Sequence, residues 1–421
     1  MLGGSDRRHM AAEALSEPQV LAHAKRRLFP ERDESRSYAV VDTQFATETW
    51  RTNERIPDGV REALAPFNHV RVGSGYPDLV GVRTLENELL SVDRLGDEPP
   101  LVVVEAKGYT DRGTVDVEGA LVQAHDRLGE ANAAYVAAPI DAITQTARTI
   151  ARELNVGVLG VTPRGAVDPL ETPRIVGNRT TTETTAIRLQ ATAQGVADRS
   201  FGLNHPKNYL AYPVSLYAAH DTETLLAEHV VGATAQARTG AAFLGLIETR
   251  PAGDRLTPLG REVVRFAVEE HGSARAAVER FDDWKRSSRR FVDVAPRWGQ
   301  LARRVVFDYP ATELLVEELQ RMYDDGIAEP TLPQLVTYLH ELHPTFAVEL
   351  FVRGTDRARQ RVLDERGGLR REPLTDPTIY HSPTTFQLKA MLYHAGILTE
   401  RGAEPSRLVP ERDVWALRSA I

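Results

Sequence analysis

Two carboxylates and one lysine stand in the sequence in an order that suits metal-assisted hydrolysis. Asp78 follows Pro77 and opens an apolar run, and a second apolar run ends in Glu105-Ala106-Lys107. The two carboxylates and the Ala106 carbonyl offer oxygen ligands to a hard cation, for which Mg²⁺ fits best and Mn²⁺ is the substitute. Lys107 can orient or deprotonate a water and stabilise an anionic transition state. These residue types in this order indicate hydrolysis of phosphodiester bonds.

Short β-strands are the elements that must position these side chains. The run from Pro100 to Lys107 is apolar and β-branched and too short for most helices, so we predict an interior strand. The segment from His69 to Thr84 has two strand-like runs around Gly-Ser-Gly, which predicts a hairpin. Asp78 and Glu105 would then lie on adjacent strands. Because side chains alternate along a strand, Glu105 and Lys107 share one face.

The following residues continue in the alternating pattern of an α/β domain. Ala134 to Pro139 is predicted to be a strand, Ile140 to Leu154 a helix, and Val156 to Val161 another strand. This alternation predicts a mixed sheet flanked by helices.

The residues resemble the catalytic motif of the PD-(D/E)XK nuclease superfamily, in which an Asp is followed on the next strand by Glu-x-Lys. The Gly-Ser-Gly-Tyr-Pro-Asp segment that ends at Asp78, with Arg71 before it, also looks like that of archaeal Holliday-junction resolvases and of the VRR-NUC group. The resemblance covers roughly residues 60 to 162. It implies a restriction endonuclease-like fold, with Asp78 and Glu105 as metal ligands and Lys107 as the catalytic lysine.

The resemblance also implies two supporting residues. The helix after the second strand contains Gln123, where several branches of the superfamily place a glutamine that supports the site. An acidic residue on a helix before the hairpin is expected as well, and both Glu17 and Glu62 are candidates. Glu17 has the better helix start, with Ser16 as cap and Pro18 in the first turn. Glu62 is nearer the hairpin, as in the resolvases.

Composition narrows the class of protein. With 421 residues and 42% hydrophobic content, the chain can bury more than one core, and its length predicts two or three domains. No apolar run approaches the roughly 18 residues needed to span a membrane. The amino terminus lacks an apolar signal core, so we expect a cytoplasmic protein without a membrane partner. The absence of cysteine excludes thiolate zinc sites, disulfides and cysteine nucleophiles.

Arginine supplies almost all of the positive charge, since the only lysines are Lys25, Lys107, Lys207, Lys285 and Lys389. Few lysines, abundant Asp, Glu and Ala and a net charge of -8 suggest a halophilic archaeon or a GC-rich genome, and composition does not separate the two. The acidic total does not exclude a nucleic-acid partner, because a local basic face can still contact phosphates.

The carboxy-terminal half is predicted to be mainly helical, with two winged-helix-like units. In the first, an apolar helical stretch ends in Gly-Leu-Ile, and Leu-Thr-Pro-Leu-Gly at residues 256–260 opens another helix. Residues 386–410 repeat this order. We therefore predict a nuclease-like domain at 1–162, a Pro- and Thr-rich transition at 163–208, a winged-helix-like domain at 209–300 and a helical region with the second unit at 301–421.

These patterns predict a magnesium-dependent nuclease that hydrolyses DNA phosphodiester bonds, in defence, repair or junction processing. The alternative from another class is a DNA-binding winged-helix regulator whose nuclease-like domain is an inactive scaffold. A third interpretation is an RNA-directed nuclease, because the catalytic residues contact phosphate rather than sugar or base. A homodimer is the expected assembly, since many members of the superfamily cut two strands by dimerising.

Overall fold

The apolar, β-branched runs of the amino-terminal half form a six-stranded mixed sheet. In spatial as well as chain order, its strands are β1 (Tyr38–Val41), β2 (Leu79–Val82), β3 (Leu101–Ala106), β4 (Ala133–Pro139), β5 (Gly157–Val161) and β6 (Val167–Glu171). Strand β2 is antiparallel to both β1 and β3, the strands β3, β4 and β5 run parallel to one another, and β6 returns antiparallel to β5. The mixed α/β architecture and the three strands predicted within residues 100–161 are confirmed.

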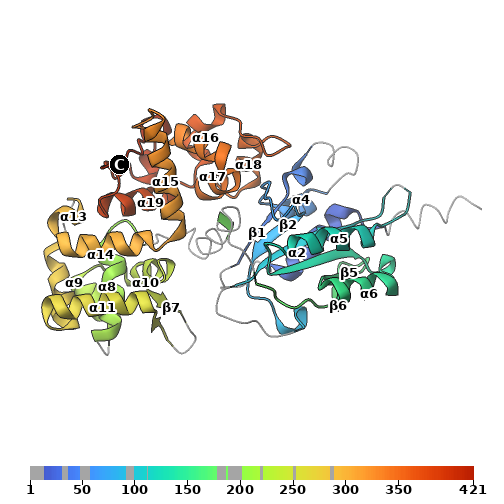
Figure 1. The fold of residues 1–421 in the computed structure, drawn as a ribbon, viewed down its shortest axis with the longest axis horizontal. Helices are drawn as coiled ribbons and strands as arrows, with labels where there is room; N and C mark the ends of the chain where they lie inside the picture. Colours follow the sequence, from blue (N-terminus) through green and yellow to red (C-terminus); the bar gives the residue numbers. More distant parts are fainter. Residues whose placement is uncertain are drawn as a thin grey trace, which may run out of the picture. The chain divides into compact units, whose positions relative to one another are not determined.

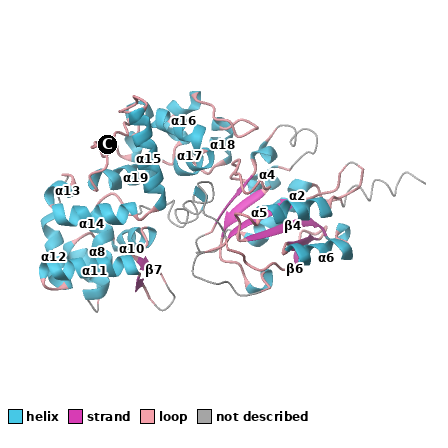
Figure 2. Ribbon diagram, viewed as in Figure 1, coloured by secondary structure: helices cyan, strands magenta, loops and turns pink. Residues whose placement is uncertain are grey.

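The chain forms two units, and each combines two separate stretches of sequence. Unit 1 comprises residues 1–195 and 340–373, and unit 2 comprises residues 196–339 and 374–421. Figure 1 colours the chain along its sequence, and Figure 2 colours it by secondary structure. The computed structural model describes residues 14–30, 37–47, 57–91, 99–110, 112–177, 186–187, 202–218, 221–249, 253–284 and 289–421.

Helices cover both faces of the sheet in unit 1 (Figure 1). On one face, α2 (Glu17–Leu28) and α4 (Asp58–Leu64) bury their apolar side chains with Val102 and Val104 of β3. On the other face, α5 (Val117–Arg127) and α6 (Gln145–Leu154) pack with the alternate residues of that strand. Because side chains alternate along a strand, Glu105 belongs to the face that α5 covers.

The predicted hairpin over residues 69–84 is wrong. Around its Gly-Ser-Gly turn only Val72 and Gly75 form an antiparallel bridge, and β2 pairs with β1 and β3 instead. Gly73 adopts a φ of 64°, and the Cβ of any other residue at Gly75 would lie 2.9 Å from the Arg127 guanidinium. The turn is therefore packed against the end of α5, and Val70 and Val72 of its first arm contribute to the same apolar cluster as Val80 and Val82 of β2.

Residues 340–373 join unit 1 from far along the chain. They form α17 (Pro344–Phe351) and α18 (Asp356–Val362). Glu349 of α17 is buried and accepts a hydrogen bond of 2.6 Å from the Asn68 side chain, next to the sheet. This contact joins residues 281 positions apart, so unit 1 is complete only when the later stretch is present.

The unit boundaries therefore differ from the predicted domain boundaries. Unit 1 does not end at residue 162, because β6 extends the sheet and Asn132 and Val176 exchange hydrogen bonds of 2.8 and 2.9 Å beyond it. The predicted region 301–421 is divided between both units. Parts of the predicted transition, residues 178–185 and 188–201, lie outside the described residues.

Unit 2 is mainly helical, as predicted. Its two short strands, β7 (Ile247–Glu248) and β8 (Arg255–Leu256), pair antiparallel, and Thr257 caps the next helix by accepting a hydrogen bond of 3.0 Å from Gly260 N. Its helices are α8 (Pro206–Ala218), α9 (Thr222–His229), α10 (Thr234–Phe243), α11 (Pro258–His271), α12 (Ala274–Arg280), α13 (Phe291–Val294), α14 (Pro296–Phe307), α15 (Pro310–Asp324) and α19 (Ser382–His394).

Helix α16 (Leu332–Leu342) includes residues of both units. None of the described helices is long and apolar enough to cross a membrane. Short 3-10 helices complete the described structure: η1 (Thr43–Ala46), η2 (Asn87–Leu89), η3 (Ile140–Ala142), η4 (Phe281–Trp284), η5 (Glu372–Thr375), η6 (Pro377–Ile379), η7 (Pro405–Arg407) and η8 (Pro410–Arg412).

Candidate active site

Three carboxylates follow one another across the sheet, where β1 ends, β2 begins and β3 ends. Val41 pairs with Leu79, and Leu79 pairs with Val104, so the register places Asp42 opposite Asp78 and Asp78 opposite Glu105. The Asp42 amide donates to the Asp78 carbonyl over 3.0 Å, which extends the pairing by one residue. All three side chains are at least 95% buried, with exposed fractions of 4, 3 and 4%. The expected placement of Asp78 and Glu105 on adjacent strands is confirmed, and sequence reasoning missed Asp42.

Asp78 is the centre of this row. Its Oδ2 accepts a hydrogen bond of 2.7 Å from the Ala106 amide. Burial raises the pKa of Asp78 to about 7; the positive charge of Lys107 opposes the shift, and the negative charges of Glu17 and Asp42 add to it. The carboxyl group is thus poised to hold a proton near neutral pH unless a cation replaces it.

Glu105 has a similar electrostatic environment. Burial raises its pKa to about 7, and the negative charge of Asp78 adds to that shift, whereas Arg127 and Lys107 oppose it. Its Oε1 accepts a hydrogen bond of 3.1 Å from Arg127 Nε. Because the negative charge of Asp78 raises the pKa of Glu105, ionisation of Asp78 disfavours ionisation of Glu105.

Lys107 lies directly after β3 and is half-buried. Its amide donates to the Ala137 carbonyl over 2.9 Å, so the parallel pairing with β4 fixes its main chain. Its ammonium group favours the charged form of both carboxylates, which places its charge beside them. The structure therefore brings together the three residues that the sequence predicts as metal ligands and catalytic lysine.

Of the two candidate helix-borne acids, the structure brings Glu17 to the site. Glu17 is the first residue of α2, and its negative charge raises the pKa of Asp78. Gly108, directly after Lys107, packs against the Glu17 main chain so closely that a Cβ there would overlap it. Glu62 is exposed on α4.

Gln123 does not join the cluster. It is exposed on α5, and among the described residues no hydrogen bond links it to Asp78 or Glu105. Arg127, one turn further along the same helix, makes the contact with Glu105 instead. The four-residue spacing from Gln123 is the signal that could have identified Arg127, because residues four apart share a helix face.

A second set of side chains surrounds Asp42. Its Oδ2 lies 2.7 Å from His69 Nδ1, and the His69 ring stacks on Tyr76 with centroids 3.5 Å apart and planes 16° from parallel. Tyr76 stands two residues before Asp78, and 45% of its surface is exposed. No pattern in the sequence joins these residues, which the fold brings together from three segments.

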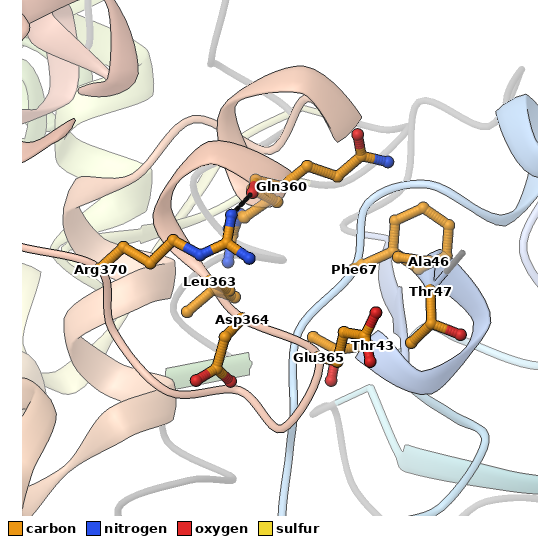
Figure 3. Close-up of a pocket in the computed structure, with 10 residues that line it drawn as sticks. Thr43, Ala46, Thr47, Phe67, Gln360, Leu363, Asp364, Glu365 and Arg370 are labelled. Carbon is orange, nitrogen blue, oxygen red and sulfur yellow. Dashed lines mark hydrogen bonds between the residues drawn. The ribbon is translucent and has the colours of Figure 1, made fainter. Parts of the chain in front are cut away.

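The 3-10 helix η1 lies between the carboxylates and a pocket. The Asp42 side chain caps it by accepting a hydrogen bond of 2.9 Å from the Gln44 amide, and Gln44 Nε2 donates to Asp78 Oδ1 over 3.0 Å. Other residues of η1 line a pocket together with the end of α18 and the loop after it (Figure 3). The pocket therefore borders the candidate site.

The donor set fits a magnesium ion bound through few protein ligands. Among the described residues, no group of three His, Asp or Glu side chains is arranged to hold a metal ion. Mg²⁺ is, however, usually bound by one or two carboxylates together with waters and phosphate oxygens. Asp78 and Glu105 supply two carboxylates. In an antiparallel pair, the N–H and the C=O of one residue point to the same side of the strand. The Ala106 carbonyl therefore lies on the side of β3 from which the Ala106 amide bonds Asp78.

Comparison of the chain with known protein families, curated proteins and solved structures finds no match.

Proposed function

We propose that this protein is a metal-dependent nuclease that hydrolyses phosphodiester bonds, with DNA as the first substrate to test. The observation that carries the proposal is the buried pair of Asp78 and Glu105, which lie opposite each other on β2 and β3 beside Lys107. Two neighbouring buried carboxylates are unfavourable on their own, and a bound cation offsets that cost. Titratable groups perturbed in this way gather at functional sites.

Each residue of the cluster has a role in this reaction. Asp78, Glu105 and the Ala106 carbonyl would hold the cation, while the contact between Arg127 and Glu105 fixes the orientation of one of these groups. When bound, Mg²⁺ would neutralise negative charge on the phosphate and lower the pKa of a water molecule. Lys107 orients that water and stabilises the negative charge that develops in the transition state.

The topology of unit 1 supports a restriction endonuclease-like fold. The antiparallel strands β2 and β3 carry the acidic residues, α5 follows β3, and β4 lies parallel to β3. This is the order that the resemblance of the motif to PD-(D/E)XK nucleases implies. The position of Glu17 at the start of α2 agrees with an acidic residue on a preceding helix.

Unit 2 supports contact with a nucleic-acid duplex. The order α8, α9, α10, β7 and β8 agrees with that of a winged helix, in which three helices precede a two-stranded wing. A groove between α8, β8 and α11 is lined by three arginines and two acidic residues, Arg255, Arg261, Arg265, Asp254 and Glu269. Guanidinium groups gathered in this way can bind phosphates without reading the base sequence.

The test of the nuclease proposal uses the purified full-length chain in high potassium chloride. Supercoiled, linear, branched and single-stranded DNA and RNA would be incubated with Mg²⁺, Mn²⁺ or a chelator. Asp78→Ala and Lys107→Ala would be compared with Asp141→Ala and Arg112→Ala, which change exposed charges outside the cluster. We expect metal-dependent cutting that only the first two variants lose. Equal cutting by all four variants would contradict the mechanism.

The arginine-lined groove also favours a second candidate, a DNA-binding regulator with unit 1 as an inactive scaffold. That protein would bind duplex DNA in the presence of a chelator, and Glu105→Gln would leave both its affinity and the absence of cutting unchanged. The same incubations therefore separate the two functions. Gel filtration of the protein with and without DNA would test the expected homodimer.

A further inference from the structure

A pocket of about 200 Å³ lies in unit 1 and is lined in part by η1 (Figure 3). One wall comes from η1 and Phe67, and the other comes from Gln360, Leu363 and the loop that ends at Arg370. Both walls belong to unit 1, although about 300 residues separate them in the sequence. The role proposed for unit 1 so far does not use this pocket.

Thr43 is the feature that indicates a ligand. Its side chain is 5% exposed and lines the pocket, and its hydroxyl has no hydrogen-bond partner among the described residues. A buried polar atom without a partner is unfavourable and is rare in folded proteins. A polar atom of a bound molecule would satisfy it.

The walls define the chemistry of that molecule. Phe67 and Leu363, which are 1% and 4% exposed, form the apolar part of the pocket wall. Glu365 is an exposed carboxylate with no ion pair within the described part of the chain. Arg370 uses one nitrogen to donate to the Gln360 carbonyl over 3.0 Å, and no described carboxylate neutralises its charge. A flat ring with amino donors, attached to a phosphate, would satisfy all of these groups.

The pocket is also placed where a nucleic-acid strand would reach it. Thr43 directly follows Asp42, and its neighbour Gln44 donates to Asp78 over 3.0 Å. A strand whose phosphate lies at the carboxylates would thus have an adjacent nucleotide beside η1. A base can enter such a pocket only when it is unpaired or turned out of its stack.

We propose that this pocket receives one unpaired nucleobase of the substrate strand, next to the phosphate that is cut; this inference rests on the proposed nuclease function. Glu365 accepts hydrogen bonds, so it favours the amino groups of cytosine, adenine or guanine and disfavours the carbonyl edge of thymine or uracil. Thr43 bonds a second atom of the base, and Arg370 binds a flanking phosphate. The pocket thereby selects substrates with an unpaired, amino-bearing base near the cut.

The test measures binding and cutting separately, with labelled oligonucleotides that carry a single unpaired cytosine or thymine at successive positions. In a chelator, the full-length protein should bind one position about tenfold more tightly with cytosine than with thymine. Glu365→Gln should abolish that preference, while Glu341→Gln, which changes an exposed carboxylate of the same stretch outside the pocket, should keep it. Thr43→Val should weaken binding of both oligonucleotides severalfold at an unchanged melting temperature, because the lost hydroxyl has no partner among the described residues.

The outcomes separate the two proposals. Wild-type cutting with equal affinity for cytosine and thymine in every variant would overturn the base pocket and leave the nuclease standing. A cytosine preference that Glu365→Gln abolishes, without cutting of any substrate, would support the pocket and contradict the nuclease. Free deoxycytidine monophosphate is the last arm: if it bound as tightly as the strand and with the same variant effects, the pocket would belong to a free nucleotide, and the proposal would fail.

Discussion

Unit 1 buries two clusters of acidic side chains, and they are neutralised to different extents. Glu349 of α17 is 1% exposed and accepts two hydrogen bonds from the Arg359 guanidinium, of 3.0 and 3.1 Å, and another of 2.6 Å from Asn68. The Tyr38 hydroxyl donates to it as well. Both oxygens of Glu349 are therefore occupied, and a full positive charge lies against them.

The cluster of Asp78 and Glu105 lacks this balance. Glu105 receives one nitrogen of Arg127, and Asp78 receives an amide and a side-chain NH₂ group, both uncharged. Burial raises the pKa of each carboxyl group to about 7. Burial is thus common to both clusters, and incomplete neutralisation distinguishes the cluster of Asp78 and Glu105, where it leaves a place for a cation.

The largest expected effect comes from removing the counter-charge of the balanced cluster, which consists of Glu349 with Arg359, Asn68 and Tyr38. Arg359→Met should lower the free energy of unfolding by about 3–5 kcal/mol, because it leaves the Glu349 carboxylate buried without its counter-charge. Urea denaturation followed by circular dichroism would measure it. Arg359→Met combined with Glu349→Gln should recover part of the loss. A single variant as stable as the wild type would show that this ion pair does not hold residues 340–373 in unit 1.

In the unbalanced cluster of Asp78 and Glu105 with Lys107, a substitution should reduce activity and leave stability unchanged. Lys107→Ala should reduce the rate of metal-dependent cutting by at least about 100-fold while the protein stays folded, because the lysine stabilises charge present only in the transition state. Single-turnover cleavage rates and urea denaturation would measure the two effects on the same sample. A cutting rate within twofold of wild type would contradict this prediction. So would a decrease in the free energy of unfolding as large as that of Arg359→Met.

The pH dependence of stability should reveal the same distinction. In the unfolded chain the two carboxyl groups ionise near pH 4, whereas their pKa values in the folded protein are about 7. Between these values the folded state binds more protons, so the free energy of unfolding should fall as pH rises, by on the order of 4 kcal/mol for each of the two groups, and level off above pH 7. Asp78→Asn should remove most of this slope, and Mg²⁺ should restore stability at the high-pH end.

Denaturation curves measured from pH 4 to 8, with and without Mg²⁺, would check these slopes. Stability that rises over this interval in the metal-free wild type would contradict the raised pKa values. A slope that Asp78→Asn leaves intact would assign the titration to other groups.

The sequence predicts those parts of the site that have local patterns. Asp78, Glu105 and Lys107 come from apolar runs whose period and length identify strands, and Ser16 indicates the helix start that carries Glu17. Asp42 could have been found by the same rule, because it ends the apolar run of β1.

The remaining features depend on tertiary contacts that leave no local pattern. The hydrogen bond between Tyr38 and Glu349 joins residues 311 positions apart, and nothing near either residue indicates the other. For that reason the return of residues 340–373 to unit 1, and the pocket that they complete, could not be predicted. The hairpin prediction failed similarly, since packing of the Gly-Ser-Gly turn on Arg127 overrode the local strand pattern.

The smallest effect is expected at the rim of the unbalanced cluster. Tyr76 is 45% exposed and lies flat on His69, which Asp42 holds in place, so its outer face is preorganised for stacking on a base. Tyr76→Ala should weaken binding of single-stranded DNA by about 1 kcal/mol, roughly fivefold in Kd, and Tyr76→Phe should retain most of the affinity because the ring remains. Fluorescence anisotropy in a chelator would measure this loss, with Tyr323→Ala as the control for an exposed tyrosine on α15. If Tyr76→Phe lost as much affinity as Tyr76→Ala, the hydroxyl rather than the ring would make the contact, and the stacking interpretation would be wrong.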